Sequence, residues 1–488
     1  MAAAQHLIAQ DPEADKNNPA HLKVGTLSYT KAGLITLFLY LLWGDFCFCL
    51  MEAVVPNILP LKLSSIGAPN VMMGLIVTSI PNLMNTVINP FASFRSDRFR
   101  SKWGRRIPFL AGATPFLVIF LILLGYSEPI SRWLRTVGMG GNVSQMSILL
   151  AVIGVLMVCF QFFNLFITSV YYYLFNDVVP HAFLSRFMAL FKIVGNGAGA
   201  LFNFFVYKYV NTHMSEIFLG AALLYFFAFS IMCWKVKEGE YPPPPPNIGN
   251  KHGLKAAIRT YAAECFTHRF YWYFFLLNTC GAMGAVAGPY YMLAVIKLFG
   301  IDPGTYGKVV GVTGIISMSL LYPAGMIADR FHPLRVLILC SFLSFCSVPF
   351  VLTLYFGFQH FSMDHRLILW ICISALSLPF SALNQAAELP MYMKLLPKER
   401  FGQFCSANAM IRSCALIIGG IGCGLFLDYT KKFNPDPNYC YRFVPLWAVT
   451  FHIGVLIFYT LLYREWKRLG GLKNYVAPQV EVMNGVAG

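Results

Sequence analysis

Twelve stretches of mostly apolar residues run through this chain of 488 residues, and each is long enough to cross a lipid bilayer as a helix. Charged residues make up only 12% of the chain, about half the share found in soluble domains, which is too little to cover a water-soluble surface. The sequence therefore predicts an all-α polytopic membrane protein with twelve transmembrane helices. The stretches lie near 33–59, 70–94, 107–126, 147–175, 186–210, 215–234, 270–296, 305–328, 334–357, 366–393, 402–427 and 443–463.

A polar stretch from Lys235 to Arg269 divides these spans into two groups of six and contains five consecutive prolines, Pro242 to Pro246. Consecutive prolines cannot continue a helix and favour an extended conformation. We interpret the stretch as a tether between two six-helix bundles, and a docking motif remains the alternative. The expected division is a cytoplasmic N-terminal tail (1–32), an N-terminal bundle (33–234), a cytoplasmic linker (235–269), a C-terminal bundle (270–464) and a cytoplasmic C-terminal tail (465–488).

The distribution of positive charge predicts the orientation. An even number of spans places both termini on one side of the membrane, and the segments on that side carry most of the 37 Lys and Arg residues. Because cytoplasmic loops concentrate Lys and Arg, we expect a multi-pass protein of a cell membrane, bacterial inner or plasma membrane, with both termini cytoplasmic. The net charge of +16 thus reflects membrane topology, and nucleic acid is not an expected partner.

A short marker recurs after the second span of each half. It reads Asp97-Arg98 in the first half and Asp329-Arg330 in the second, and a small residue precedes each pair by four positions. These charges can meet helix ends and each other, so we expect them to latch one conformation. A cluster that only enforces topology is the alternative. The expected latch residues are Asp97, Arg98, Arg105, Asp177, Arg186, Asp329 and Arg330.

Twelve spans, a repeat of six and six, and these Asp-Arg pairs resemble the major facilitator superfamily over nearly the whole chain. The loop Ser-Asp-Arg-x-x-Ser-x-x-Gly-Arg-Arg-x-Pro-Phe at 96–109 resembles the glycoside–pentoside–hexuronide:cation symporters, and still more their sucrose-transporter-like branch. The segments 56–60, 67–74 and 396–402 are similar to the same branch. The resemblance implies coupled uptake of a sugar or glycoside by alternating access between two rocking six-helix halves.

The second span departs from that family in one respect. Melibiose-type members carry two sodium-binding carboxylates there, four residues apart and just before a proline. This chain has Asn85 and Asn89 ahead of Pro90. An amide oxygen can ligate a hard cation but brings no negative charge, so sodium affinity at this place should fall.

Two carboxylates in the first span are the expected proton-coupling residues. Asp45 and Glu52 are seven residues apart, hence on roughly one helix face. An ionisable group at bilayer depth is costly and is a functional hypothesis by default. Glu52 lies nearer the outer end, where a solvated or locally paired carboxylate is the alternative.

The remaining polar groups inside spans are the expected substrate-binding residues. Amides and charges can bind sugar hydroxyls, and Trp43 offers an aromatic platform, although single aromatic residues in such a chain more often face lipid or core. Two further alternatives stay open: Glu388 can pair with Arg412 as a structural bridge, and Lys192 can snorkel to the interface. The set is Trp43, Asn164, Lys192, Asn278, Asn384, Gln385, Glu388 and Arg412.

The sequence carries no phosphate-binding loop of the G-x-x-x-x-G-K-[ST] type, no metal-ligand spacing and no nucleophile–His–acid arrangement. We therefore expect neither a metal, nor a cofactor, nor enzymatic activity. The leading prediction is a monomeric, proton-coupled symporter of a sugar or glycoside, with the bilayer, the solute and the proton as its partners. An exporter or exchanger of another small organic solute is the alternative, and a membrane-embedded enzyme or sensor is the remote one.

Overall fold

The computed structural model describes residues 23–138, 141, 143–240, 265–397 and 400–478, and this part of the chain is almost entirely helical. It contains twelve helical stretches that are long and apolar enough to cross a membrane. The predicted all-α fold with twelve spans in two six-helix bundles is thereby confirmed. The five prolines of the predicted tether lie outside the described residues.

The first bundle follows a short hairpin of two strands, β1 (Lys23–Val24) and β2 (Leu27–Ser28). Spans 2 and 5 each contain a π-helical turn, and a short helix follows span 3 outside the spans. In order, the helices are α1 (Lys31–Ser65), α2 (Asn70–Gly74), η2 (Leu75–Ser79), α3 (Ile80–Arg98), α4 (Ile107–Gly125), α5 (Ser127–Thr136), α6 (Gln145–Val178), α7 (His181–Leu201), η3 (Phe202–Val206), η4 (Tyr207–Tyr209) and α8 (Met214–Lys235).

The second bundle repeats the arrangement with six further spans. Its helices are α10 (Arg269–Ala285), α11 (Gly288–Leu293), η5 (Ala294–Leu298), α12 (Pro303–Arg330), α13 (Pro333–Cys346), α14 (Val348–Gly357), η6 (Phe358–His360), α15 (Met363–Leu395), α16 (Phe401–Thr430), η8 (Lys431–Phe433), η9 (Pro437–Phe443), α17 (Val444–Arg468) and α18 (Gly471–Asn474).

Several spans begin at residues that favour a helix start. The side chains of Thr30, Ser144, Asp302 and Ser362 each accept a hydrogen bond from the backbone nitrogen three residues further on. Proline stands in the first turn of α4, α12, α13 and α17, where its missing N–H costs nothing. Local sequence thus fixes where these spans start.

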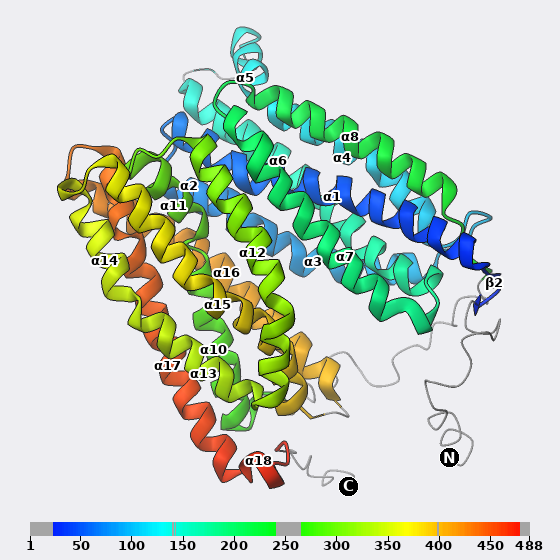
Figure 1. The fold of residues 1–488 in the computed structure, drawn as a ribbon. Coiled ribbons are helices and arrows are strands. Elements are labelled where there is room, and N and C mark those ends of the chain that lie inside the picture. The colour runs from blue at the N-terminus through cyan, green and yellow to red at the C-terminus, as the bar shows by residue number, and fades with distance from the viewer. Residues whose placement is uncertain (1–22, 139–140, 142, 241–264, 398–399, 479–488) are drawn as a thin grey trace, which may run out of the picture.

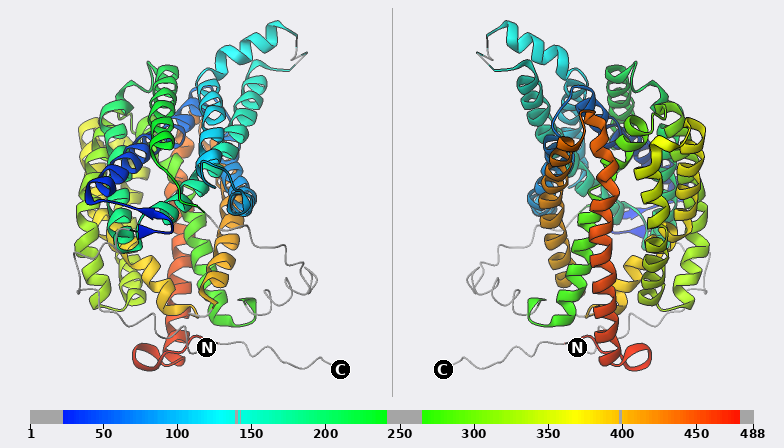
Figure 2. Two further views of the ribbon diagram at one scale, coloured as in Figure 1. Left: turned by 90° about the vertical axis from the view of Figure 1, so that its right-hand side faces the viewer. Right: turned by 90° about the vertical axis from the view of Figure 1, so that its left-hand side faces the viewer.

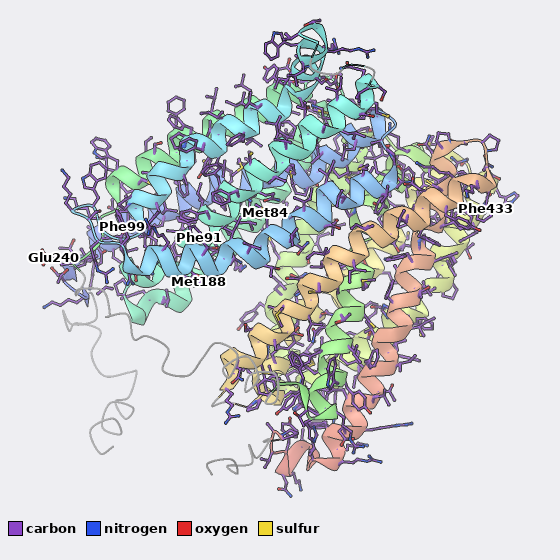
Figure 3. All side chains as sticks on the ribbon, turned by 180° about the vertical axis from the view of Figure 1, so that it is seen from behind. Met84, Phe91, Phe99, Met188, Glu240 and Phe433 are labelled. Atoms are coloured by element: carbon purple, nitrogen blue, oxygen red, sulfur yellow. The ribbon has the colours of Figure 1, made fainter. Side chains whose placement is uncertain are left out.

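Figure 1 shows the two bundles meeting at one end and diverging toward the other. The first and last described elements, β1 with β2 and α18, lie at the diverging end, which we call the terminal end. Figure 3 shows Glu240 at the terminal end of the first bundle and Phe433 at the opposite, closed end of the second. The two views of Figure 2 show α5 projecting beyond the first bundle at the closed end.

Glycines bring the bundles together at the closed end. In the contact of span 2 with span 11, a Cβ on Gly74 would lie 1.9 Å from the carbonyl oxygen of Gly420. In the contact of span 5 with span 8, a Cβ on Gly307 would lie 2.2 Å from the carbonyl oxygen of Asn203. Only glycine allows backbones this close. The two contacts are counterparts of each other in the repeat of six and six, because span 8 corresponds to span 2 and span 11 corresponds to span 5.

The core of the first bundle lies where spans 1, 4 and 6 meet. Phe48, Tyr171, Tyr225 and Phe229 are buried and their rings contact each other in tilted and edge-to-face arrangements. The hydroxyl of Tyr171 donates to the carbonyl oxygen of Leu41 at 2.7 Å, one turn before Asp45. This packing fixes the rotation of α1, and with it the direction in which Asp45 points.

Candidate functional site

Asp45 is fully buried in α1. The thiol of Cys49, one turn further on, donates to its Oδ1 at 3.5 Å, whereas Oδ2 has no hydrogen-bond partner among the described residues. Gly195 of α7 packs against it, since a Cβ there would lie 3.6 Å from Oδ2 and 3.1 Å from the sulfur of Cys49. Asp45 is therefore a buried carboxyl group between spans 1 and 5 with one oxygen that lacks a hydrogen-bond partner among the described residues. Such a group costs free energy, which indicates a functional role.

Glu52 contacts a different span. Its Oε1 accepts a hydrogen bond from Nδ2 of Asn164 in α6 at 3.2 Å, and the same nitrogen lies 3.4 Å from Oε1 of Gln161. Asn164 is nearly buried, and its own Oδ1 has no partner among the described residues. Glu52, a predicted proton-coupling residue, thus meets Asn164, a predicted substrate-binding residue, between spans 1 and 4. This contact corresponds to the locally paired alternative for Glu52.

The two asparagines of span 2 are linked to each other. Nδ2 of Asn89 donates to Oδ1 of Asn85 at 2.5 Å, and the hydroxyl of Ser169 in α6 donates to Oδ1 of Asn89 at 2.6 Å. Both amides are half-buried. Amides and a hydroxyl therefore occupy the place that the sequence comparison associated with sodium-binding carboxylates.

A cavity of about 280 Å³ lies inside the second bundle, between α10, α13, α15, α16 and α17. Four of the predicted substrate-binding residues line it: Asn278, Asn384, Glu388 and Arg412. Ser341 and His452 add further polar groups, and Nε2 of His452 lies 2.9 Å from the carbonyl oxygen of Ser341. The cavity combines an acid, a base, amides and a hydroxyl, which is the mixture that orients a small polar ligand.

Tyr392 ties this polar cluster together. Its hydroxyl lies 2.5 Å from Oδ1 of Asn278 and 2.9 Å from Oε1 of Glu388. A phenol carries one proton and can donate to only one of these two oxygens at a time. The cluster therefore has room for one further proton, or for a donor from a ligand.

Glu388 and Arg412 both line the cavity. The ion pairs of the described residues do not include one between them, so the structural bridge considered above does not form here. Gln385 lies differently from Asn384 and Glu388. Gln385 does not line the cavity, and its side-chain nitrogen donates to the hydroxyl of Ser381 at 3.3 Å instead.

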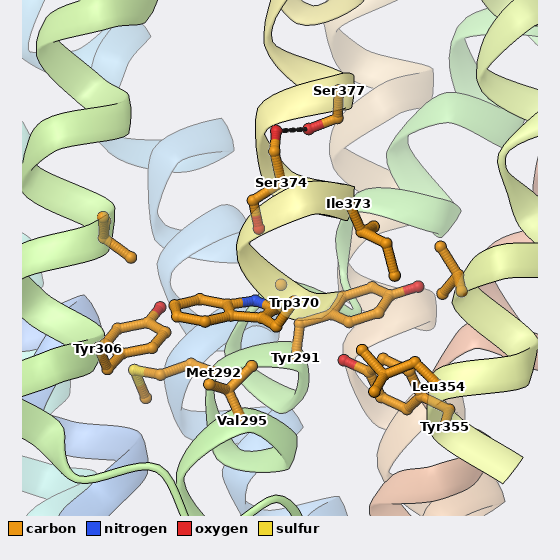
Figure 4. A pocket seen from close by; sticks show the side chains of 13 residues that line it. Tyr291, Met292, Val295, Tyr306, Leu354, Tyr355, Trp370, Ile373, Ser374 and Ser377 are labelled. Atoms are coloured by element: carbon orange, nitrogen blue, oxygen red, sulfur yellow. Dashed lines mark hydrogen bonds between the residues drawn. The ribbon is translucent and has the colours of Figure 1, made fainter. Parts of the chain in front are cut away.

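Aromatic rings line a second cavity of about 300 Å³ nearer the closed end, between α11, α12, α14 and α15. Figure 4 shows Tyr306 and Trp370 side by side in it, and their rings are stacked at 5.6 Å between centroids and 13° between planes. Tyr291 and Tyr355 stand edge to face at 5.9 Å, and the hydroxyl of Ser377 donates to the carbonyl oxygen of Ser374 at 2.7 Å. An aromatic wall beside two hydroxyls suits the apolar face and the edge of a sugar ring.

Trp43 and Lys192 are both exposed. The Trp43 ring stacks on Phe46 of its own helix at 6.0 Å. Lys192 lies on α7 and, with Glu52, acts electrostatically on Asp45. Neither residue lines the two cavities of the second bundle.

At the terminal end, Arg105 and Asp177 form a two-point ion pair. Nε and Nη2 of Arg105 lie 2.9 and 2.5 Å from the two carboxylate oxygens, and Nε of Arg106 lies 3.1 Å from Oδ2. Arg106 also lies over the ring of Tyr173 at 5.1 Å. These contacts join the loop before α4 to the end of α6, so they lie within the first bundle.

The other predicted latch residues are less completely described. The backbones of Asp97, Arg98, Arg186 and Asp329 belong to α3, α7 and α12, but their side chains lie outside the described set. Arg330 is exposed at the end of α12, with its guanidinium 5.9 Å from the ring of Phe331.

The sequence analysis missed three groups of this site. His452 is an ionisable residue inside the last apolar span, and the rule applied to Asp45 would have singled it out. Tyr392 lies one turn after Glu388, which is a usable signal. Nothing local marks the pair Tyr306 and Trp370, because the two residues lie on different spans.

Two packed six-helix bundles, with polar and charged groups enclosed between their apolar spans, define a membrane transporter. The chain matches the family model of the Major Facilitator Superfamily over residues 41–420 and belongs to that superfamily.

Solved structures agree with this fold. A bacterial homologue of the human lysosomal transporter Spinster, inward-facing and unoccupied, is 13% identical with a TM-score of 0.64, covering 92% of this chain and 100% of its own. A D-xylose–proton symporter is 11% identical with a TM-score of 0.62, covering 88% and 98%. A nucleoside transporter is 12% identical with a TM-score of 0.61, covering 88% and 99%. At these identities the likeness shows the fold alone.

Proposed function

We propose that this protein is a secondary active transporter that takes up a sugar or glycoside together with protons. The observation that carries the proposal is the cavity in which Asn278, Glu388 and Arg412 converge with Tyr392 at its edge. Sugars present hydroxyls that both donate and accept, and this cluster offers an acceptor, a permanent donor and an amide that is both. The fold itself also serves a D-xylose–proton symporter, which is compatible with this substrate class.

The aromatic cavity supports the same class of substrate. Trp370 lies on α15, the helix that also carries Asn384 and Glu388 of the polar cavity, and the ring of Tyr306 stacks on it from α12. A sugar ring has apolar C–H faces and polar edges, so it gains from aromatic and polar walls together. The resemblance of the 96–109 loop to the sucrose-transporter-like branch favours sugars over other small solutes.

Protons are the proposed coupling ions, with Asp45 as their carrier and Glu52 as the second candidate. A hard metal cation takes several oxygen ligands, and Asp45 contacts a thiol and a glycine instead. The span 2 site offers uncharged groups, the amides of Asn85 and Asn89 and the hydroxyl of Ser169. A proton needs one acceptor atom, and Oδ2 of Asp45 supplies it.

The orientation follows from the charge bias of the loops. With cytoplasmic termini, the end at which the bundles diverge faces the cytosol, and the structure corresponds to an inward-facing state. We also propose that the two bundles, residues 33–234 and 270–464, move relative to each other as units. The latch residues at the terminal end would stabilise one of the two arrangements. In this state Arg105 and Asp177 hold the first bundle's own helices together.

Counterflow in proteoliposomes tests this function. Vesicles loaded with an unlabelled disaccharide should transiently accumulate the labelled sugar, and an inside-alkaline pH gradient should increase uptake. Counterflow that an imposed pH gradient does not change would identify the exchanger alternative. No counterflow with any sugar or glycoside, combined with counterflow of another solute class, would overturn the proposed substrate.

A further inference from the structure

A third cavity, of about 560 Å³, opens between α4 and α8 on the first bundle. It lies at the terminal end of these two spans, where the loop before α4 meets the residues that follow α8. In Figure 1, α4 and α8 lie on the side of the first bundle that faces away from the second bundle. The cavity is therefore separate from the groups proposed to bind sugar and proton.

Away from its mouth, this cavity is lined by small and apolar side chains of α4 and α8. Ala111 and Ser230 are small and exposed, and Ile107 and Cys233 form a buried apolar floor. Small side chains between two adjacent spans leave a groove at the protein surface. Its volume of about 560 Å³ and its apolar floor suit a hydrocarbon chain that lies between the two helices.

Two exposed tryptophans flank the mouth. Trp103 is 64% exposed and Trp234 is 76% exposed. Tryptophan is enriched at the level of lipid headgroups, where its ring meets both water and hydrocarbon. The mouth of the cavity therefore lies at the membrane–water boundary.

Lysines complete the mouth. Lys102 and Lys237 line the cavity and both are exposed, and Lys235 lies over the Trp234 ring at 4.4 Å. In the part of the chain that the structure describes, no carboxylate forms an ion pair with Lys102 or Lys237.

The one acidic residue of the lining, Glu238, is engaged elsewhere. Its carboxylate accepts hydrogen bonds from the backbone nitrogens of Arg105, Arg106 and Ile107 at 2.9, 2.8 and 2.6 Å. It thus caps the start of α4, where the helix dipole favours a negative charge. The mouth accordingly keeps a net positive charge.

We propose that this cavity binds an anionic phospholipid, with its phosphate between Lys102 and Lys237 and one acyl chain in the groove between α4 and α8. Charge complementarity selects the headgroup, the tryptophans set its depth, and the apolar groove holds the chain. Basic pockets between spans at this level suit anionic headgroups, and each basic residue contributes roughly fivefold in affinity.

The test is native mass spectrometry of the full-length protein in detergent, titrated with phosphatidylglycerol or with phosphatidylcholine of the same chains. The wild type should bind phosphatidylglycerol more tightly. The double variant K102Q/K237Q should lose roughly twenty-fold of that affinity and keep its affinity for phosphatidylcholine. The variant A111F fills the groove and should weaken both lipids.

A matched variant controls for charge alone. K432Q/K467Q removes two other exposed lysines, each of which lies over a tyrosine ring outside this cavity, and it should bind phosphatidylglycerol as the wild type does. Equal binding of both lipids by the wild type, or equal losses in the two double variants, would overturn the proposal. So would displacement of the lipid by an equal concentration of inorganic phosphate, because the acyl chain would then contribute nothing.

Discussion

Asp428 in span 11 caps the start of span 2 across the boundary between the two bundles, with its Oδ1 2.9 Å from the backbone nitrogen of Asn70. Its Oδ2 lies 2.8 Å from the next backbone nitrogen, that of Val71. A carboxylate at a helix N-terminus meets unpaired N–H groups and the positive end of the helix dipole. This contact must break whenever the closed end opens, so it helps to set the equilibrium between the two states of the transporter.

Asp428→Asn should therefore favour opening of the closed end. An amide replaces one of the two acceptor oxygens by a donor, and hydrogen bonds to charged groups contribute roughly 1.5–3 kcal/mol. We expect the population to shift about tenfold or more. Hydrogen–deuterium exchange should be faster in segments 66–79 and 417–428. Asp436→Asn is the control, because Asp436 caps only η9 within its own bundle. Equal exchange in the two variants would contradict this role.

Gly420→Ala should act on the same equilibrium through packing. A Cβ at Gly420 would lie 2.4 Å from the hydroxyl of Ser79 and 2.8 Å from the carbonyl oxygen of Gly74. Overpacking costs roughly 1–3 kcal/mol and is relieved when the end opens. We expect faster alkylation of Cys423, which is fully buried one turn away. Gly112→Ala adds the same methyl group where nothing lies within 4 Å, and it should leave alkylation unchanged.

The twelve spans could be predicted because a helix that crosses a bilayer needs an unbroken apolar stretch, which is a local property. Which side chains meet depends on how each helix is rotated, and that is set by packing between spans. Arg105 and Asp177 were both expected among the latch residues, but nothing in the sequence near either residue indicated that they bind each other, with Arg106 as a further partner of Asp177. Asn278 and Glu388 were both expected to bind substrate, and the structure places them on one cavity, but Tyr392, which contacts both, was not expected.

The capping contact of Asp428 shows the same limit. Asp428 and Asn70 are 358 positions apart, and no pattern within either span marks them as partners. The contacts that join the two bundles at the closed end therefore could not be predicted from the sequence. The glycines that allow the close approach are present in it, but no pattern marks which of them face the other bundle.

The orientation can be tested with a membrane-impermeant thiol reagent on intact cells. A cysteine at position 135, in α5 beyond the closed end, should react from outside. A cysteine at position 237, after the last span of the first bundle, should react only after permeabilisation. Reactivity of position 237 in intact cells would contradict the proposed cytoplasmic termini.

Glu388→Gln should weaken sugar binding. The amide keeps the contact with Tyr392 but loses the charge, and a hydrogen bond to a charged group contributes roughly 1.5–3 kcal/mol. We expect the Kd measured by calorimetry to rise about tenfold to a hundredfold. Asp364→Asn is the matched control, because Asp364 is an exposed residue in the first turn of the same helix. An unchanged Kd in Glu388→Gln would exclude Glu388 from the substrate site.

Asp45→Asn should uncouple transport from the pH gradient. The neutral amide mimics the protonated acid, so the two bundles can still exchange sugar, but no proton is carried between the two sides of the membrane. We expect gradient-driven accumulation in proteoliposomes to disappear, while sugar exchange at equal pH partly persists. Sodium gradients should drive no accumulation in the wild type, because Asn85 and Asn89 pair with each other and bring no charge. Glu52→Gln separates the two carboxylates of span 1: Glu52 is held by Asn164, so this variant should retain accumulation. Full pH-driven accumulation in Asp45→Asn, together with its loss in Glu52→Gln, would reassign the proton to Glu52.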